Sequence, residues 1–326
     1  MNRRATILAL LAFGAAPLAS FAQRSAKPAR IGFLSVSPQA DVAPGLDAFK
    51  QAFREFGYVE GRDYVLEPRF ADGQFHRLPG LAVELVRLRV DLIMAAQATP
   101  TLAVQKETTT IPIVMISVGD PVGSGVVKSL ASPGGNTTGT SNSLTDIAPK
   151  HLDLLRDTVP RLSRLAVLIN PIPRSNRDAL KIIQALAPQI DVQILPIEAR
   201  SAQEIEKGFS LMIEQNAKAI IVVPNPIFFE RRRQIAELAV NGRLPCVGYS
   251  PEYADAGFLI GYGPNRFEFY PRTAVYVDKI LKGTRPADLP VEQPTKFELV
   301  INLKTAKRLG LTIPRSVMIR ADRVIE

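Results

Sequence analysis

From residue 29 onward, short apolar segments alternate with longer segments in which apolar residues recur every three or four positions. The first apolar segment, 31–35, precedes a segment in which Leu46, Phe49, Phe53 and Phe56 have this helical spacing. Short strands that alternate with amphipathic helices are typical of a parallel α/β sheet. The pattern therefore predicts an α/β protein, with these four side chains in its core.

The alternation occurs twice, on either side of a turn-rich segment. In the first part, strands are expected at 31–35, 64–70, 91–95 and 111–117, and helices at 46–56, 78–89, 99–107 and 123–130. Residues 132–139 are rich in Gly, Ser, Pro and Asn and suit a crossover between two lobes. In the second part, strands are expected at 165–169, 192–196, 219–223, 245–248 and 257–261, and helices at 148–158, 175–187, 202–214, 229–241 and 268–281. Two lobes of the same kind are the expected result.

The N-terminus has the pattern of an export signal. Arg3 and Arg4 precede an apolar run over residues 5–19, and Ser20 and Ala22 place small residues at positions suited to cleavage. We expect residues 1–22 to be a signal peptide that is cleaved after Ala22, with export by the Sec or the twin-arginine route. The mature protein is then expected to be soluble in the periplasm. An uncleaved N-terminal anchor is the alternative.

Composition and charge exclude several classes of protein. The 326 residues are 46% hydrophobic and 22% charged, which is typical of a globular chain long enough for two domains. The two histidines and Cys246 are too far apart in sequence for a zinc site, so no metal site is expected, and Cys246 is predicted to be a small buried side chain. The net charge of +9 falls to +7 without residues 1–22, but the positive residues are scattered. Nucleic acid is therefore not an expected partner.

Small and polar residues follow nearly every predicted strand. In open α/β sheets, ligands bind at the carboxyl ends of the strands, where loops and helix N-termini meet. Two facing sets of such residues predict a cleft between the lobes that takes a small ligand. The candidate ligand-binding residues are Ser35, Ser37, Gln39, Gln97, Ala98, Thr99, Ser117, Asp120, Ser141, Asn170, Asn225 and Tyr249.

Some of these residues carry more specific hypotheses. The backbone N–H groups and the hydroxyl at Ala98 and Thr99 lie at a predicted helix start, where they are suited to a ligand carboxylate. Asp120 would either pair with a ligand ammonium or cap the helix expected at Gly123. Glu252 and Asp255 are the alternative partners for an ammonium.

No catalytic motif is recognised in the chain. The segment 139–143 lacks the final glycine of GxSxG, and the glycine-rich segment 119–125 matches neither the dinucleotide fingerprint nor the Walker loop. His76 and His151 are expected to be structural, with His151 on a helix surface. We therefore expect no catalytic residues and no enzyme. An exported hydrolase with one of these histidines as base is the alternative, and a cytosolic effector-binding regulator is disfavoured by the signal.

A series of short motifs, in order along the chain, resembles one known family. They are FGYVEG at 56–61, RLP at 77–79 with LAVELV at 81–86, TIPIV at 110–114, DPV at 120–122, SPGGNTTG at 132–139 and LKTAKRLGL at 303–311. On these motifs the chain resembles the exported substrate-binding proteins of ABC transporters of the tryptophan/tyrosine-binding type. The resemblance extends from the first strand to the C-terminus, although most of the motifs concern architecture rather than the ligand.

The resemblance implies a type I periplasmic-binding fold, in which two Rossmann-like lobes with parallel sheets are joined by three crossovers around a ligand cleft. Lobe 1 is expected to comprise residues 30–140 and 264–285, and lobe 2 residues 141–263 and 290–326. The implied protein is a monomer without a cofactor. Its lobes close around an amino acid, with or without an aromatic side chain, or around a similar carboxylate, and present it to the membrane permease and ATPase subunits of an importer. Because the chain has no Trp, Tyr249 or Tyr262 would stack on an aromatic ligand.

Overall fold

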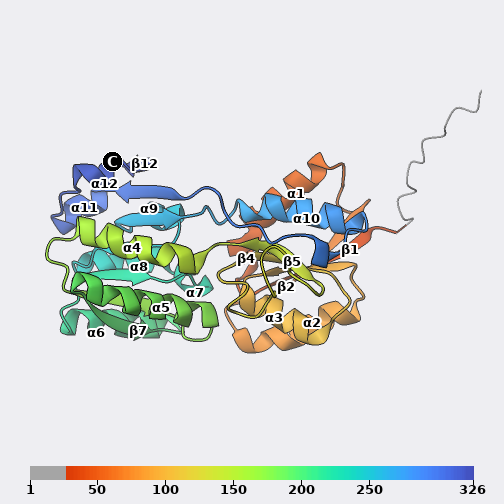
Figure 1. Cartoon of the computed structure of the whole chain (residues 1–326), viewed down its shortest axis with the longest axis horizontal. Helices are drawn as coiled ribbons and strands as arrows, with labels where there is room; N and C mark the ends of the chain where they lie inside the picture. The colour runs from red at the N-terminus through yellow and green to blue at the C-terminus, as the bar shows by residue number, and fades with distance from the viewer. Residues whose placement is uncertain (1–26) are drawn as a thin grey trace, which may run out of the picture.

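The computed structural model describes residues 27–326, so the predicted signal peptide and its cleavage after Ala22 lie outside the described residues. The described chain forms two α/β lobes that lie side by side along the long axis of the molecule (Figure 1). The predicted α/β class and its two lobes are confirmed. None of the helices within residues 27–326 is long and apolar enough to cross a membrane.

Lobe 1 contains a five-stranded parallel sheet with the order β2-β1-β3-β4-β5. Every residue of its central strand β3 is buried, because helices cover both faces of the sheet. Its strands are β1 (Ala29–Ser35), β2 (Tyr64–Phe70), β3 (Leu92–Ala96), β4 (Ile113–Val118) and β5 (Thr137–Ser141).

Successive residues of the strands in lobe 1 point to opposite faces of the sheet, where they pack into two separate hydrophobic layers. Phe33 and Met94 pack on the side of α1 and α10, whereas Leu34 and Ala95 pack on the side of α2 and α3. This alternation follows from the two-residue period of a strand. The helices of lobe 1 are α1 (Gln39–Glu55), η1 (Phe75–Arg77), α2 (Leu78–Arg87), α3 (Ala98–Glu107), α10 (Phe269–Leu281) and η3 (Pro286–Asp288).

The predicted core residues of the first helix are buried with one exception. Phe49 and Phe53 are fully buried and stack on each other with ring centroids 5.2 Å apart. Phe56 is 40% exposed, so its prediction as a core residue is wrong. The helix ends at Glu55, and the chain then turns through Gly57 at a positive φ of 84°. Phe56 therefore no longer follows the helical stripe that faces the sheet.

Lobe 2 contains a seven-stranded sheet with the order β12-β11-β10-β9-β8-β6-β7. Its neighbouring strands pair in parallel except for β10 and β11, which are antiparallel, so the two C-terminal strands run opposite to the other five. Its strands are β6 (Arg164–Ile169), β7 (Gln193–Glu198), β8 (Ala219–Val222), β9 (Cys246–Gly248), β10 (Ile260–Gly263), β11 (Glu298–Asn302) and β12 (Arg323–Ile325).

The helices of lobe 2 follow the predicted pattern with one division. The helix predicted at 229–241 forms two shorter helices that meet at Arg231, and the first begins earlier, at Pro226. Asn225 caps this first helix through its side chain, which accepts a hydrogen bond from the backbone N–H of Ile227. The helices are α4 (Leu144–Thr158), α5 (Arg174–Leu186), η2 (Ala187–Ile190), α6 (Ala202–Glu214), α7 (Pro226–Glu230), α8 (Arg232–Asn241), α9 (Pro251–Asp255), α11 (Leu303–Leu309) and α12 (Arg315–Met318).

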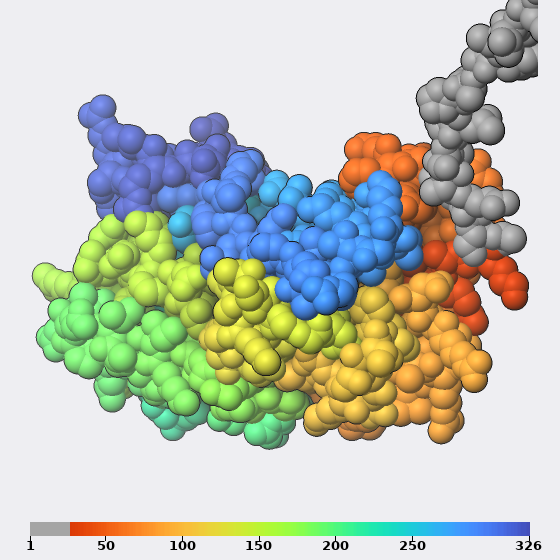
Figure 2. Space-filling model, turned by 45° about the vertical axis from the view of Figure 1, so that its right-hand side comes forward, coloured from red at the N-terminus to blue at the C-terminus, as the bar shows by residue number. Residues whose placement is uncertain are grey.

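Three connections join the lobes, after β5, after β10 and before β11. The first and third lie side by side, because Ser141 N donates to Glu292 O at 2.8 Å and Thr138 Oγ1 donates to Leu289 O at 2.6 Å. In the space-filling view, the blue segment with α10 and the third connection lies across the junction of the lobes (Figure 2). The sheets follow the predicted division of the chain, while the stated lobe boundaries stay a prediction.

Two local predictions around the first connection are wrong. The helix predicted at 123–130 is absent, and the chain instead forms turns in which the N–H groups of Val126 and Val127 both donate to Pro121 O. The segment 132–139 is more than a turn-rich break, since its end belongs to β5, which pairs with β4. The chain therefore completes the first sheet before it crosses to lobe 2.

Candidate functional site

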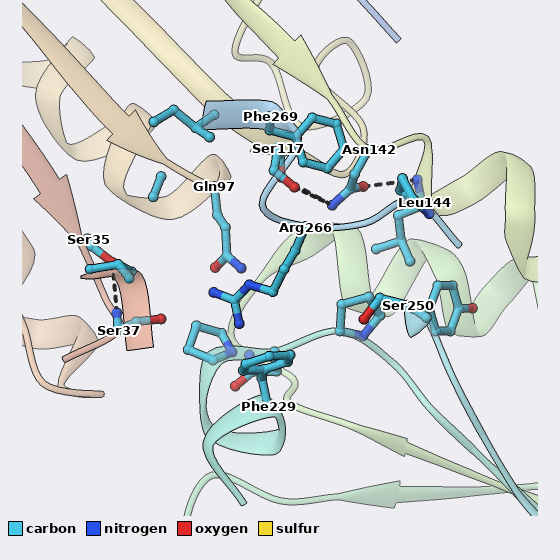
Figure 3. Close-up of a pocket in the computed structure, with 18 of the residues that line it drawn as sticks. Ser35, Ser37, Gln97, Ser117, Asn142, Leu144, Phe229, Ser250, Arg266 and Phe269 are labelled. Carbon is cyan, nitrogen blue, oxygen red and sulfur yellow. Dashed lines mark hydrogen bonds between the residues drawn. The ribbon is translucent and has the colours of Figure 1, made fainter. Parts of the chain in front are cut away.

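A pocket lies between the lobes at the carboxyl ends of their strands (Figure 3). It encloses about 800 Å³, including its opening to solvent. Lobe 1 contributes residues that follow β1, β3 and β4, and lobe 2 contributes residues that follow β8 and β9. The connection between β10 and α10 completes the wall. The strand-end rule thus places a cleft where the sequence predicted it.

The structure brings most of the predicted site residues together. The following predicted residues line the interlobe pocket: Ser35, Ser37, Gln97, Ser117, Asn225 and Tyr249. A second, narrower pocket adjoins it and is lined by Ala98 and Thr99 as well as by Gln97, Ser117 and Asn225. We call this second space the side pocket. Ligand contact by these residues stays a prediction.

Four predicted residues line neither pocket. Three of them form hydrogen bonds within the protein, and the fourth lies at the start of a helix. Gln39 begins α1. Asp120 accepts a hydrogen bond from Gly123 N at 2.8 Å, and Ser141 Oγ accepts one from Ser143 N at 3.1 Å. Asn170 Nδ2 donates to Asn225 Oδ1 at 3.4 Å, so it supports a residue that does line the pocket.

The alternative partners for an ammonium or an aromatic ring also lie outside both pockets. Asp255 forms a bidentate ion pair with Arg323, with N–O distances of 2.7 and 2.9 Å. Glu252 is absent from both pocket walls. The ring of Tyr262 stacks on Phe297, with centroids 6.2 Å apart.

Arg266 is the main residue that the sequence analysis missed. It lies in the connection after β10, and its guanidinium carbon is 3.8 Å from the centroid of the Phe229 ring. Its side chain reaches into the middle of the pocket, between Phe229 and Gln97 (Figure 3). No hydrogen bond or ion pair joins this guanidinium to another residue within 27–326. It follows the strand predicted at 257–261, a strand end at which the sequence analysis named no charged candidate residue.

The backbone at two strand ends of lobe 1 has an unusual conformation. Gln97 has φ 72° and ψ 173°, and Ser117 has φ 55°. Both residues line both pockets. Asn142 supports Ser117, because its Nδ2 donates to both the carbonyl and the hydroxyl oxygen of Ser117 at 3.1 Å. Backbone strain of this kind is concentrated at ligand sites, where the surrounding structure maintains it.

The lobe 2 wall holds buried donors without partners. Asn225 is 3% exposed, and its Oδ1 accepts from Ile227 N at 3.2 Å, which fixes the orientation of its amide. Its Nδ2 has no hydrogen-bond partner, and neither has Nδ2 of Asn176, which is 2% exposed and lines the side pocket. The hydroxyl of Tyr249 is likewise unpartnered. Buried polar groups normally find partners, so these donors point to a missing acceptor.

Two helices begin at the side pocket, one from each lobe. The first residues of α3 (Ala98, Thr99) and of α5 (Ser175, Asn176) line it. No side chain caps either helix, and within the described chain no acceptor meets the first N–H groups, which are those of Ala98 and Thr99 in α3 and of Arg174 and Ser175 in α5. The N–H of Asn176 donates to Pro173 O at 3.2 Å. The positive end of each helix dipole therefore faces the same space. This arrangement suits an anionic group.

His151 is buried, so its prediction as a helix-surface residue is wrong. Its ring lies 3.8 Å from the ring of Tyr249, and its Nε2 is 2.8 Å from the carbonyl oxygen of Tyr262. Burial lowers the pKa of His151 to about 4, so the ring is neutral near pH 7. It supports the pocket wall from behind and does not line either pocket.

The other groups that were considered for catalysis or metal binding lie elsewhere. His76 is exposed in η1 and lines neither pocket. Cys246 is buried as predicted, and burial raises the pKa of its thiol. In the described part of the chain, no group of three or more His, Cys, Asp or Glu residues is arranged to hold a metal ion.

Comparison with known proteins identifies relatives over nearly the whole chain. Residues 42–325 match the family model described as ABC transporter substrate binding protein. A tyrosine-binding protein of Clostridioides difficile (strain R20291) is 23% identical over 287 residues, which cover 88% of this chain and 82% of that protein.

Solved structures share the fold at low sequence identity. A conserved domain protein from Vibrio cholerae has a TM-score of 0.85 at 24% identity and covers 91% of this chain and 100% of its own. An ABC domain from Streptococcus pneumonia in complex with L-Trp has a TM-score of 0.84 at 23% identity, with 92% and 100% coverage. The likeness confirms the predicted type I periplasmic-binding fold. Because the family model matches most of its length, the chain belongs to the ABC transporter substrate-binding proteins.

Proposed function

We propose that this protein is the exported substrate-binding component of an ABC importer for a small carboxylate, such as an amino acid with an aromatic side chain. The ligand binds between the lobes, lobe closure encloses it, and the closed form delivers it to the membrane permease and its ATPase. The protein acts as a monomer without a cofactor and performs no reaction. Family membership supports the transport role, and the names of two relatives, one tyrosine-binding and one bound to L-Trp, support an amino acid.

One observation carries the choice of a carboxylate. The uncapped N-termini of α3 and α5 meet at the side pocket, beside the unpartnered Nδ2 groups of Asn176 and Asn225. All of these groups donate hydrogen bonds, and they come from both lobes. A carboxylate held there accepts from both lobes at once, which couples binding to closure.

Thermal unfolding with a panel of amino acids and small acids tests this proposal. A true ligand at a hundredfold excess over its dissociation constant stabilises the protein by about 2.7 kcal/mol. Native mass spectrometry of the same samples identifies the bound molecule. A ligand that is recovered chemically converted would contradict the absence of a reaction and would favour the hydrolase alternative.

Substitution of the donors tests the site itself. Asn176→Asp and Asn225→Asp keep the shape of the side chain but replace a donor with a negatively charged acceptor. We expect each variant to bind the carboxylate at least about tenfold more weakly, because a like charge now faces the ligand. Asn216→Asp, at an exposed position, is the control. Unchanged affinity in both pocket variants would place the carboxylate elsewhere.

The export step has its own test. The intact mass of the protein recovered from the periplasm should correspond to a chain that begins at Gln23. A soluble periplasmic species that retains residues 1–22 would contradict the predicted cleavage.

A further inference from the structure

We infer that the natural ligand carries two acidic groups joined by a nonpolar body, as a dicarboxylate does, and that it lacks the ammonium group of an amino acid. This inference rests on the proposed binding of a carboxylate, and within that class it chooses a dicarboxylate over the amino acid that the names of the relatives suggest. The evidence is the charge of the two adjoining pockets, whose lining holds separate places for two anionic groups and no partner for a cation.

The first place for an anion is Arg266. Contact with the Phe229 ring holds its guanidinium in the pocket. An arginine carries five N–H donors, and those of Arg266 have no acceptor among residues 27–326. A planar pair of donors matches a carboxylate, which accepts two parallel hydrogen bonds.

The second place is the side pocket. There the N-termini of α3 and α5 meet the buried, unpartnered amides of Asn176 and Asn225. The two pockets share part of their walls, including Gln97, Ser117 and Asn142. One small molecule can therefore occupy both spaces, with one acidic group against Arg266 and the other at the helix N-termini.

The wall between these two places is largely apolar. Ile116, Leu144, Ile147 and Phe269 line the interlobe pocket beside the polar groups. Apolar walls with a few directed polar groups are typical of small-molecule sites. They favour a hydrocarbon body between the two acidic ends.

No aspartate or glutamate is among the residues that line either pocket. The carboxylate of Asp120 lies against its own turn, since Oδ1 accepts from Gly123 N at 2.8 Å and Oδ2 would be 2.0 Å from a Cβ placed on Gly123. An ammonium ion enclosed without an anionic partner is strongly disfavoured, the more so beside Arg266. The pocket therefore discriminates against zwitterions.

Two carboxylates outside the pocket walls could contradict this inference. Both carboxylate oxygens of Glu252, which precedes the pocket residue Tyr253, are buried without a hydrogen-bond partner. Asp41 is the other group. It lies in the first turn of α1, next to the pocket residue Val42, and its Oδ2 is buried without a hydrogen-bond partner. Asp41 itself lines neither pocket. If lobe movement exposed either carboxylate to the cleft, it would supply the partner that an ammonium needs, so the test includes both residues.

Calorimetric titration with matched compounds tests the inference. The probes are linear dicarboxylates from succinate to suberate and the three benzenedicarboxylates, together with L-tyrosine and L-tryptophan. The monoamide of the tightest dicarboxylate is the matched compound. We expect that dicarboxylate to bind at least about tenfold more tightly than its monoamide and than either amino acid.

Arg266→Gln should remove this preference. The variant is expected to bind the dicarboxylate at least about tenfold more weakly while its affinity for the monoamide changes little, because the monoamide has no second charge to lose. Arg232→Gln is the matched control, since Arg232 stacks on the same Phe229 ring at 4.1 Å but lines neither pocket. Both variants are first checked for an unchanged melting temperature without ligand.

The outcomes separate this inference from the proposed function. Tighter binding of an amino acid than of every dicarboxylate, with an affinity that Asp41→Asn or Glu252→Gln lowers and Arg266→Gln does not, would overturn the inference and leave the carboxylate-binding function standing. Binding of dicarboxylates that is insensitive to Arg266→Gln would also overturn it. Absence of binding by every acid and amino acid would overturn both.

Discussion

Gln97 combines a strained backbone with a place in the wall of the interlobe pocket. Its φ of 72° with ψ of 173° lies in a region that only glycine adopts readily, and its side chain lies in the pocket (Figure 3). Gln97→Gly should raise the free energy of unfolding by about 1 kcal/mol, because relief of strain exceeds the added entropy of the unfolded chain. The same variant should bind ligand more weakly, since a polar group of the wall is lost.

Urea unfolding and ligand titration of this variant measure the two effects separately. Asp191→Gly is the control, since Asp191 also has a positive φ, of 54°, but is exposed and distant from the pocket walls. It should leave ligand affinity unchanged. A Gln97→Gly protein that is less stable than the original chain would show that the surroundings of Gln97, rather than strain, dominate at this position.

His151 makes stability depend on pH. Burial lowers its pKa to about 4 in the folded protein, against about 6.5 in the unfolded chain, so between these values the unfolded chain binds more protons. The free energy of unfolding should therefore fall as pH decreases from about 6.5 to about 4, by an amount on the order of 3 kcal/mol for this residue alone. Above pH 6.5 the contribution is complete and constant.

Denaturation of His151→Gln at pH 4.5 and pH 7.5 checks this dependence. The variant retains a side chain that can donate to the carbonyl of Tyr262 but has no titrating ring, so its stability should change less between the two pH values. His76→Gln, at the exposed histidine, should retain the original pH dependence. Equal pH dependence in His151→Gln and the original chain would assign the effect to other groups.

At the level of residues, sequence rules identify which residues line the pocket better than they identify which side chains contact each other. Ser35, Ser37 and Gln97 were predicted because parallel strands bring their carboxyl ends together, and they line the pocket. Arg266 was missed because its approach to Phe229 depends on the path of an interlobe connection, which local periodicity does not encode. His151 was misplaced because its charged sequence neighbours suggested solvent, whereas the helix turns its ring toward Tyr249.

At the level of elements, β5 depends on a glycine that touches its neighbouring strand. Gly139 has φ 137°, and a Cβ placed there would lie 2.0 Å from the backbone oxygen of Met115 in β4. Gly139→Ala should therefore lower the free energy of unfolding by about 3 kcal/mol or more, because the backbone of two paired strands must move apart. Gly139 also accepts a hydrogen bond from Glu292 N at 3.0 Å, so the third connection is disturbed as well.

Gly135→Ala is the matched control for this clash. Gly135 also has a positive φ, of 65°, but nothing lies within 4 Å of a Cβ placed there. The difference in unfolding free energy between the two variants measures the steric contact together with the greater backbone strain of an alanine at φ 137° than at φ 65°. Equal stabilities would mean that β4 and β5 adjust freely to the added methyl group.

The elements that sequence predicted well are those with a strong period and a buried face. The helix expected at 202–214 is observed with those bounds, and a serine caps its first turn. The helix expected at 123–130 failed, because Gly123, Ser124 and Gly125 favour turns and Asp120 caps a turn rather than a helix there. β5 was missed because its small polar residues resemble a loop, and only pairing with β4 on one side and with Glu292 of the third connection on the other makes them a buried strand.

At the level of the whole molecule, the site exists only where the two lobes meet. The first residues of α3 belong to lobe 1 and those of α5 to lobe 2, yet both line the side pocket. A ligand that accepts hydrogen bonds from both helix N-termini links the two lobes. It therefore binds the closed conformation more tightly than the open one, and this difference in affinity shifts the equilibrium toward the closed conformation. In the proposed function, the three connections between the lobes act as the hinge for this movement.

Hydrogen exchange measured by mass spectrometry tests this coupling between the lobes. Ligand should slow exchange at both helix starts together, in peptides that cover 98–101 and 174–177, because backbone N–H groups of both helices become donors to the same anion. Peptides of α6, which contributes no residue to either pocket wall, serve as the internal control. Protection confined to one helix start would mean that the ligand binds a single lobe. Hydrogen bonds from both lobes to the ligand would then not explain lobe closure.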